Sequence, residues 1–336
     1  MDKIDRAILN SLLVNMGYKE GEKVAIIKQE WNPAFDERYR DKFLKSEELC
    51  RRMYDVFKSA GVEVELLSYM PPEARNGVDA TPDLYEKIGF KEIIFMPTAF
   101  SLTHTNFRRA QTEKGSRIAS MPGFTLEMFE EGGPMDVDYQ LLHQQTEAEA
   151  EKLRNSRYVR VIAEDTDITV EIDPSLVHVS SGVLTQPGKF GNLPGAEAYV
   201  VPVHEGDSNG YFTVPAGWGG TGPLKYRAKF FVEKGRFVDV KGDTPEAQEY
   251  IDKEIKPLIF GGKDFNILAE LGIGTNPNIT GEYVQKKGWN TLVAEKIFGS
   301  IHFASGNSKG MGGRNDVPVH IDWVVPNVRT EYYNKS

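Results

Sequence analysis

The sequence predicts an α/β N-terminal domain with a mostly parallel sheet, followed by a β-rich (α+β) C-terminal domain that carries a metal site. Up to about residue 155, short apolar runs alternate with longer segments of helical pattern, which is typical of a parallel sheet flanked by helices. After about residue 156, short alternating runs separated by turn residues indicate a mainly β half. A chain of 336 residues is long enough for two domains, which we place at 1–155 and 156–336.

The first half repeats a strand followed by a helix. The runs KVAIIK (23–28), VEVELL (62–67) and KEIIFM (91–96) have the composition of buried strands. Gly61 and Gly89 mark the ends of the helices that precede the second and third of these runs. The expected order is helix 4–16, strand 23–28, helix 46–60, strand 62–67, a helix ending at 88, strand 91–96, helix 103–114, strand 117–123 and helix 144–155.

The second half reads as a series of short strands. They are YVRVIAE, DITVEID, AYVVPV, YFTVPA and LKYRAKFFVEKGRFVDVKG. In the last run, Glu233, Lys234 and Gly235 form a hairpin loop between strands over 224–232 and 236–240. One helix, over 245–255, interrupts the strands.

Composition and charge exclude several classes of function. The net charge of -9 at pH 7 argues against a nucleic-acid partner, because nucleic-acid-binding domains are usually basic. The first 24 residues lack the apolar stretch of a signal peptide or a membrane span, so we expect a cytoplasmic protein with no membrane partner. Cys50 is the only cysteine, so His and carboxylates must hold any metal.

A His-x-Asp pair near the C-terminus is the first candidate metal ligand. His320 and Asp322 are two positions apart in HIDWVV, which reads as a strand. Side chains alternate across a strand, so the imidazole and the carboxylate point to the same face. For an isolated His-x-Asp, a satisfied polar pair at a sheet edge is the more common explanation. Three further ligand-type residues within the preceding ~50 positions, all in apolar or Gly-rich surroundings, favour a metal.

Those further residues are Glu270, Glu295 and His302. Glu270 opens the turn ELGIGTNPN, where two glycines allow close backbone approach. His302 lies among apolar residues in SIHFASG, so we expect an interior imidazole, either a ligand or a histidine bonded to the backbone. Glu295 is either a proton-transferring acid or a surface residue paired with Lys296.

Two more candidates lie earlier in the chain. Glu197 is the one acid in GNLPGAEAYVVP, where it either binds a cation or caps a strand end. In the first half, His104 and Arg108 lie at a loop-to-helix transition, with Thr103 or Thr105 as the cap. They are either substrate-binding residues or part of an ordinary capped helix.

Five segments resemble, in their order and spacing, the aminopeptidase T (aminopeptidase S) family of metallopeptidases. They are SLTHTNFRRAQTEKGSRIASMPG, NLPGAEAYVVP, ELGIGTNPN, GSIHFASGNS and HIDWVV. The resemblance covers most of the chain from about Pro97. It implies an α/β domain followed by a β-rich domain, a homodimer, and two divalent cations in a cleft. Residue by residue, it places the metal ligands at Glu197, Glu270, His302, His320 and Asp322, and a further acid at Glu295.

The chain departs from the peptidases at the catalytic tyrosine. That residue follows the motif imidazole by seven positions, where this sequence has Lys309. Relatives on the same scaffold include a nitroaromatic aminohydrolase and 2,5-dihydroxypyridine dioxygenases, which use one iron held by two His and one Asp. The dioxygenase pattern has a His where this chain has Glu270, and apolar residues where it has Glu197 and His302.

We therefore expect a metal-dependent hydrolase that cleaves a small peptide or amide. Metal-activated water would attack the carbonyl, and Glu295 would pass the proton to the leaving amine. Two imidazoles and three carboxylates suit one or two ions of zinc, manganese, cobalt or iron. One alternative is a mononuclear non-haem Fe(II) dioxygenase that cleaves a hydroxylated, pyridine-type ring. The other is a site that binds a small ligand without turnover.

Overall fold

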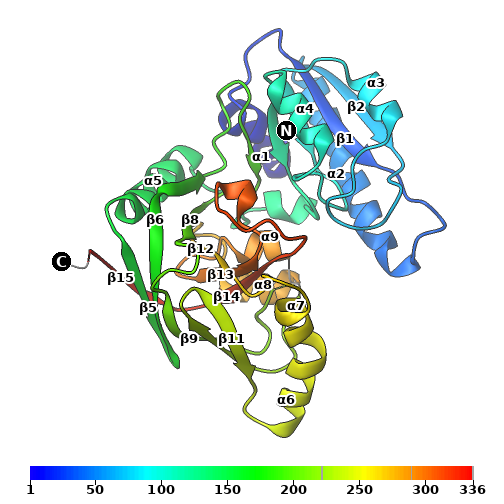
Figure 1. Cartoon of the computed structure of the whole chain (residues 1–336). Helices are drawn as coiled ribbons and strands as arrows, with labels where there is room; N and C mark the ends of the chain where they lie inside the picture. Colours follow the sequence, from blue (N-terminus) through cyan, green and yellow to red (C-terminus); the bar gives the residue numbers. More distant parts are fainter. Residues whose placement is uncertain (221, 289, 335–336) are drawn as a thin grey trace. The chain divides into compact units, whose positions relative to one another are not determined.

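The chain divides into two compact units, which are shown in Figure 1. The computed structural model describes residues 1–220, 222–288 and 290–334. The first unit comprises Met1–Gln140 and Gly182–Gly195, and the second comprises Leu141–Ser181 and Ala196–Ser336. This division differs from the expected boundary near residue 156. The helix before that boundary belongs almost entirely to the second unit, and a later segment returns to the first unit to extend its sheet.

The first unit is built on a five-stranded sheet in the order β2-β1-β3-β4-β7. Each neighbouring pair is parallel, which confirms the predicted sheet type. The strands are β1 (Lys23–Gln29), β2 (Glu63–Tyr69), β3 (Ile93–Met96), β4 (Arg117–Ser120) and β7 (Phe190–Asn192). β7 is the strand supplied by the returning segment, and it pairs with β4.

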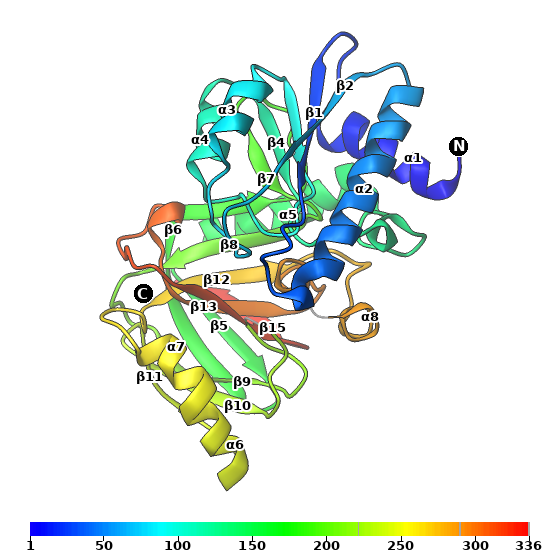
Figure 2. The same cartoon turned by 90° about the vertical axis from the view of Figure 1, so that its right-hand side faces the viewer.

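Helices cover both faces of this sheet (Figure 2). They are α1 (Lys3–Asn10), continued by a π-helical turn (Ser11–Asn15), α2 (Arg40–Ser59), α3 (Pro82–Ile88) and α4 (Asn106–Glu113), with 3-10 turns at Glu37–Tyr39 and Leu126–Phe129. On one face, Ile27 belongs to the same apolar cluster as Leu84 of α3 and Phe107 of α4. On the other face, Phe57 of α2 packs against Phe95 of β3 with ring centres 5.4 Å apart.

The predicted helix over 103–114 begins later than expected, at Asn106. Thr105 precedes it in an extended conformation, and its hydroxyl accepts a hydrogen bond from the Arg108 backbone N–H at 3.3 Å. This is an N-cap contact, which satisfies a backbone N–H that the first helical turn would otherwise leave unpaired. Of the two caps considered from the sequence, Thr105 is therefore the one used.

The second unit contains a ten-stranded antiparallel sheet. Its main path runs β11-β10-β9-β6-β8-β12-β13-β14, and β5 joins β15 to β6. The bounds are β5 (Tyr158–Ala163), β6 (Thr166–Ser180), β8 (Glu197–Pro202), β9 (Asn209–Val214), β10 (Ala228–Glu233), β11 (Arg236–Lys241), β12 (Leu268–Gly274), β13 (Ile301–Gly306), β14 (His320–Val325) and β15 (Arg329–Tyr333).

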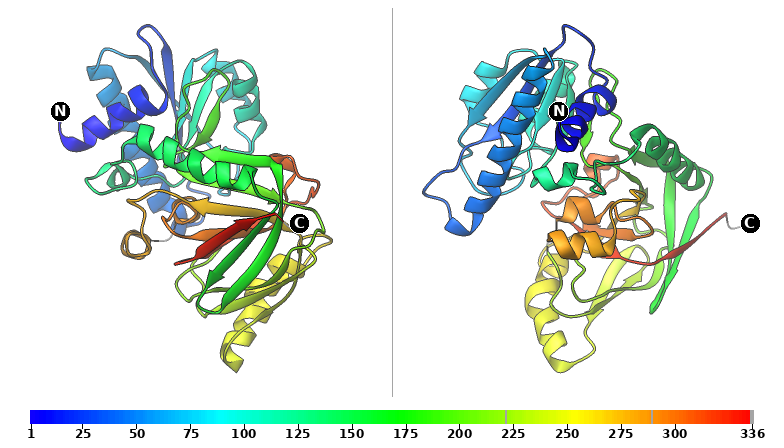
Figure 3. Two further views of the ribbon diagram at one scale, coloured as in Figure 1. Left: turned by 90° about the vertical axis from the view of Figure 1, so that its left-hand side faces the viewer. Right: turned by 180° about the vertical axis from the view of Figure 1, so that it is seen from behind.

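The long strand β6 makes this sheet curl, as Figure 3 shows. Its first part pairs with β5 and β9, and its last part pairs with β8. The register with β8 shifts between Ile172 and Val177, and an irregularity of this kind bends a strand and increases its twist. The helices of this unit are α5 (Tyr139–Arg154), α6 (Pro245–Tyr250), a π turn (Ile251–Ile255), α7 (Lys256–Phe260), α8 (Gly281–Lys287) and α9 (Thr291–Ala294), with a 3-10 turn at Lys309–Met311.

One large apolar core lies inside the second unit. Ile251, Ile255 and Ile259 lie on the run from α6 to α7 and join a cluster that includes Phe230 and Trp323 of the sheet. The two aromatic rings are in contact, with centres 4.8 Å apart. In the described part of the chain, no helix is both long and apolar enough to cross a membrane.

Candidate metal centre

Three neighbouring strands carry most of the predicted ligands. In the register of the sheet, Glu270 of β12 is opposite Ala304 of β13, which is opposite Asp322 of β14. Residues directly opposite each other in antiparallel strands project from the same face. His302 and His320 lie two positions from members of this row, so their side chains share that face. The sheet therefore gathers two imidazoles and two carboxylates.

Glu197 reaches the same face from β8. It is opposite Gly274 of β12, four positions from Glu270, and positions an even number apart on a strand face the same way. Gly272 provides the space that His302 occupies. A Cβ at Gly272 would lie 2.1 Å from the His302 Cε1 and Nε2 atoms, far inside van der Waals contact. The glycine in ELGIG is thus required for close approach of the imidazole.

The Glu270 carboxylate bridges the two imidazoles. His302 Nε2 lies 3.2 Å from Glu270 Oε1, and His320 Nε2 lies 3.2 Å from Glu270 Oε2. His320 Nε2 is also 3.3 Å from Asp322 Oδ1. The His302 side chain is 1% exposed, whereas that of His320 is 32% exposed. The cluster is therefore closed at His302 and reachable from solvent at His320.

A lysine that the sequence analysis did not select forms the other side of the cluster. Lys296 Nζ lies 3.0 Å from Glu197 Oε1 and 3.4 Å from Glu295 Oε2. The lysine side chain is 0% exposed and that of Glu295 is 15% exposed, so the alternative of a surface pair is wrong. The remaining Glu197 oxygen, Oε2, lies 3.8 Å from His302 Nε2 and links the two sides.

Burial and mutual charge shift the pKa values of this cluster strongly. Burial alone would lower the pKa of His302, but its hydrogen bond to Glu270 and the surrounding carboxylates raise it to about 9. Burial, followed by the Asp322 carboxylate, raises the pKa of Glu295 to about 8. Burial also opposes the ionised form of Asp322, but the charge of His320 outweighs it and lowers the Asp322 pKa. Protonated imidazoles thus hold ionised carboxylates together.

The donor set fits a divalent cation. Ligand atoms of Glu270, His302 and Asp322 lie within 4.8 Å of one another. Two ligands on opposite sides of one ion, each at about 2.1 Å, are about 4.2 Å apart, so a small contraction would suffice. In this cluster, three of the buried side-chain atoms make no hydrogen bond of normal geometry within the described residues: Glu197 Oε2, His302 Nδ1 and Asp322 Oδ1. Unsatisfied buried polar atoms are costly, and a cation bound by Asp322 would satisfy one of these atoms.

The predicted substrate-binding residues belong to the first unit. His104 is exposed in the turn before α4. Arg108 is buried, its Nε donates to the Thr103 carbonyl at 2.7 Å, and its guanidinium lies 3.8 Å from the centre of the Phe190 ring. These contacts position the arginine within its own unit, and substrate binding by either residue stays a prediction. Lys309, at the position of the missing tyrosine, forms an ion pair with Asp316.

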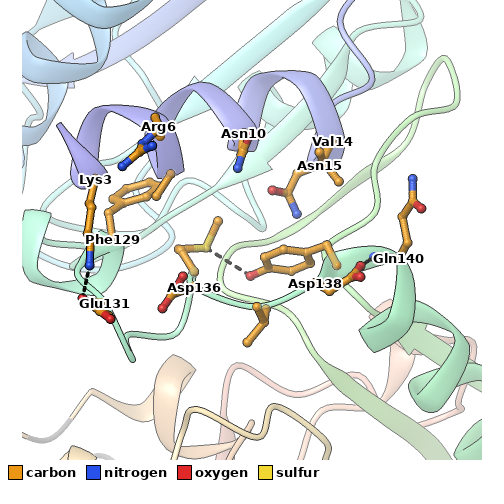
Figure 4. Close-up of a pocket in the computed structure, with 14 residues that line it drawn as sticks. Lys3, Arg6, Asn10, Val14, Asn15, Phe129, Glu131, Asp136, Asp138 and Gln140 are labelled. Carbon is orange, nitrogen blue, oxygen red and sulfur yellow. Dashed lines mark hydrogen bonds and ion pairs between the residues drawn. The ribbon is translucent and has the colours of Figure 1, made fainter. Parts of the chain in front are cut away.

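A separate groove of about 550 Å³ lies in the first unit (Figure 4). Asn10 and Asn15 line it from the N-terminal helical segment. Phe129, Asp136 and Tyr139 also line it, and the Tyr139 hydroxyl donates to the Met135 sulfur at 3.1 Å. None of the candidate site residues lines this groove, so the metal cluster and the groove are independent features.

The chain thus has two units, and the antiparallel sheet of the second carries a candidate centre for a divalent metal. Residues 64–331 match the sequence model of the family described as 2,5-dihydroxypyridine 5,6-dioxygenase (NicX). The match spans most of the chain, so the chain belongs to this family of enzymes. A search of curated protein sequences gave no match.

Two solved structures share the fold. The 2,5-dihydroxypyridine dioxygenase from Pseudomonas putida KT2440 superposes with a TM-score of 0.72 at 16% identity, over 98% of this chain and 92% of that one. Wild-type AmpT from Thermus thermophilus superposes with a TM-score of 0.64 at 13% identity, over 99% of this chain and 95% of that one. The similarity to the aminopeptidase is thus one of fold.

Proposed function

We propose that this enzyme is a ring-cleaving dioxygenase that opens a hydroxylated, pyridine-type ring with one non-haem Fe(II). The family match over residues 64–331 carries this proposal. It replaces our first expectation, amide hydrolysis, as the leading function. In the reaction, one O2 is consumed per ring opened, and both oxygen atoms enter the product.

The side chains of the cluster are compatible with such an iron. Non-haem Fe(II) oxygenases commonly hold the metal with two histidines and one carboxylate, and the bound iron activates O2 beside the substrate. His302 and His320 supply two imidazoles on either side of Glu270, and Asp322 supplies a second carboxylate. The family pattern has an imidazole at position 270. In this chain, the neighbouring strand β13 provides that imidazole, because the His302 ring lies over Gly272 and reaches to within 3.2 Å of Glu270.

Glu295 is the candidate for proton transfer in this reaction. In the metal-free cluster, burial and the Asp322 carboxylate raise the pKa of Glu295 to about 8. A group whose pKa lies near the working pH can both give and take a proton efficiently. We assign Glu295 to proton exchange with a hydroxyl group of the ring substrate.

Oxygen uptake tests the proposal. The protein is loaded with Fe(II) without air and mixed with a panel of hydroxylated pyridines and benzenes, while an oxygen electrode and ring absorbance are recorded. We expect equal loss of O2 and ring, abolished in His320→Ala and retained in His204→Ala, which removes an imidazole outside the cluster. An iron-loaded, folded enzyme that consumes no O2 with any of these rings would contradict the proposal.

Hydrolysis of a peptide or amide is the second candidate, because one cluster contains all five residues that the aminopeptidase resemblance assigns as metal ligands. The test is cleavage of aminoacyl amides by zinc, manganese or cobalt forms in the absence of O2. Glu197→Ala separates the two functions. If the enzyme is a mononuclear dioxygenase, the Glu197→Ala variant should still bind about one iron per chain. If it is a dinuclear hydrolase, the variant should lose both bound metal and amide cleavage.

A further inference from the structure

Lys296 is the least expected member of the cluster, since lysine is rarely buried without a charged partner. It follows α9, and its side chain is completely shielded from solvent. Its backbone is fixed as well: the Lys296 N–H donates to the Val293 carbonyl, and its carbonyl accepts from the Asn276 N–H, both at 3.1 Å. Lys296 is therefore fixed both by its backbone hydrogen bonds and by the contacts of its ammonium group.

The ammonium stays charged where it lies. Lys296 Nζ lies 3.0 Å from Glu197 Oε1 and 3.4 Å from Glu295 Oε2, and such carboxylate partners favour the charged form of the amine. Removal of a buried charge from its partner leaves the other charge uncompensated, which is strongly destabilising. Each of the buried charges of Lys296 and Glu197 therefore compensates the other, although 99 positions separate the two residues in the chain.

The ammonium of Lys296 contacts the Glu197 carboxylate where the aminopeptidase pattern would have a metal ion. In the aminopeptidase pattern this position is a metal ligand, but here Oε1 already accepts from Lys296. A second divalent ion bound by Glu197 and Glu295 would have to approach these same oxygens. Two cations a few ångströms apart repel each other by several kcal/mol in a partly buried site. The lysine and a second metal ion therefore exclude each other.

We propose that Lys296 is a built-in cation that takes the place of a second metal ion and limits the centre to one. This inference rests on the proposed metal centre. The single ion would be bound on the side of Glu270, His302, His320 and Asp322, while the ammonium balances the charge of Glu197 and contacts Glu295. Lys296 is thus a specificity-determining residue for metal number, and a one-iron enzyme follows from it.

Cobalt titration with elemental analysis tests this inference independently of activity. Metal-free protein, purified as a folded species by gel filtration, is titrated with Co2+ and the bound ions are counted. We expect one Co2+ per wild-type chain and two in Lys296→Met. Lys296→Gln can keep hydrogen bonds to both carboxylates but loses the charge, so it should also bind two. Lys296→Arg keeps the charge and should bind one.

Lys229→Met is the matched control. Lys229 pairs with Asp165 at 2.6 Å, outside the cluster, so its loss should leave one ion bound. Two ions in the wild type would overturn the inference while leaving the metal centre intact. One ion in both neutral Lys296 variants would also overturn it, because another feature would then set the number. No ion in the wild type would refute the metal centre itself, and with it the proposed function.

Discussion

Protons and a metal ion compete for the same imidazole nitrogens in this cluster. His302 has a pKa of about 9, and the pKa of His320 is raised well above its ordinary value. Both histidines are therefore protonated at neutral pH without metal, whereas a metal ligand must be a neutral imidazole. Glu270 and Asp322 have lowered pKa values and need no deprotonation in this range. Metal binding should thus release protons from the histidines.

The sign of the pH dependence follows from this competition. As pH rises from about 6.5 toward 9, the concentration of competing protons falls, so affinity should rise by about tenfold per pH unit for each proton released. Titration calorimetry in two buffers of different ionisation enthalpy counts the protons directly. His302→Gln should lower that count by about one. Metal affinity that does not change over this pH range would contradict the assignment of the histidines as ligands.

At the scale of elements, β12 and β13 approach closely only because one position has no side chain. Gly272→Ala would place a Cβ 2.1 Å from the His302 ring, so the imidazole must move or the strands must separate. Overpacking of this kind typically costs about 1–3 kcal/mol. We expect a lower melting temperature and at least tenfold weaker metal binding. Gly310→Ala, where an added Cβ would meet no atom within 4 Å, is the control and should change neither.

The elements that the sequence predicts well are those with local signals. The runs that form β1, β2 and β3 were identifiable from their apolar composition, and His320 and Asp322 from strand alternation. β7 was missed because FGN is too short to show a pattern, and it forms only by pairing with a distant strand. Lys296 was missed for the same reason. A lysine in sequence is expected at the surface, and its partner Glu197 becomes its neighbour only in the folded sheet.

For the whole molecule, the two units should respond differently to metal. All the cluster residues lie in the second unit, and the first unit contributes none. A ligand that binds only the folded state stabilises it by about 2.7 kcal/mol when its free concentration is 100 times Kd. The stabilisation should therefore appear in the unfolding of the antiparallel sheet. The parallel sheet has no metal ligand among the residues proposed here.

Hydrogen exchange with and without Co2+ can resolve the two units. We expect slower exchange of β12, β13 and β14 amides in the metal-bound protein and unchanged exchange of β1 and β3 amides, because protection reports the local free energy of opening. His320→Ala removes a ligand and should abolish the difference. Equal protection of both sheets would mean that they unfold as one cooperative unit, so that the metal stabilises the whole chain. Protection confined to the first unit would place the metal outside the cluster and refute the assigned centre.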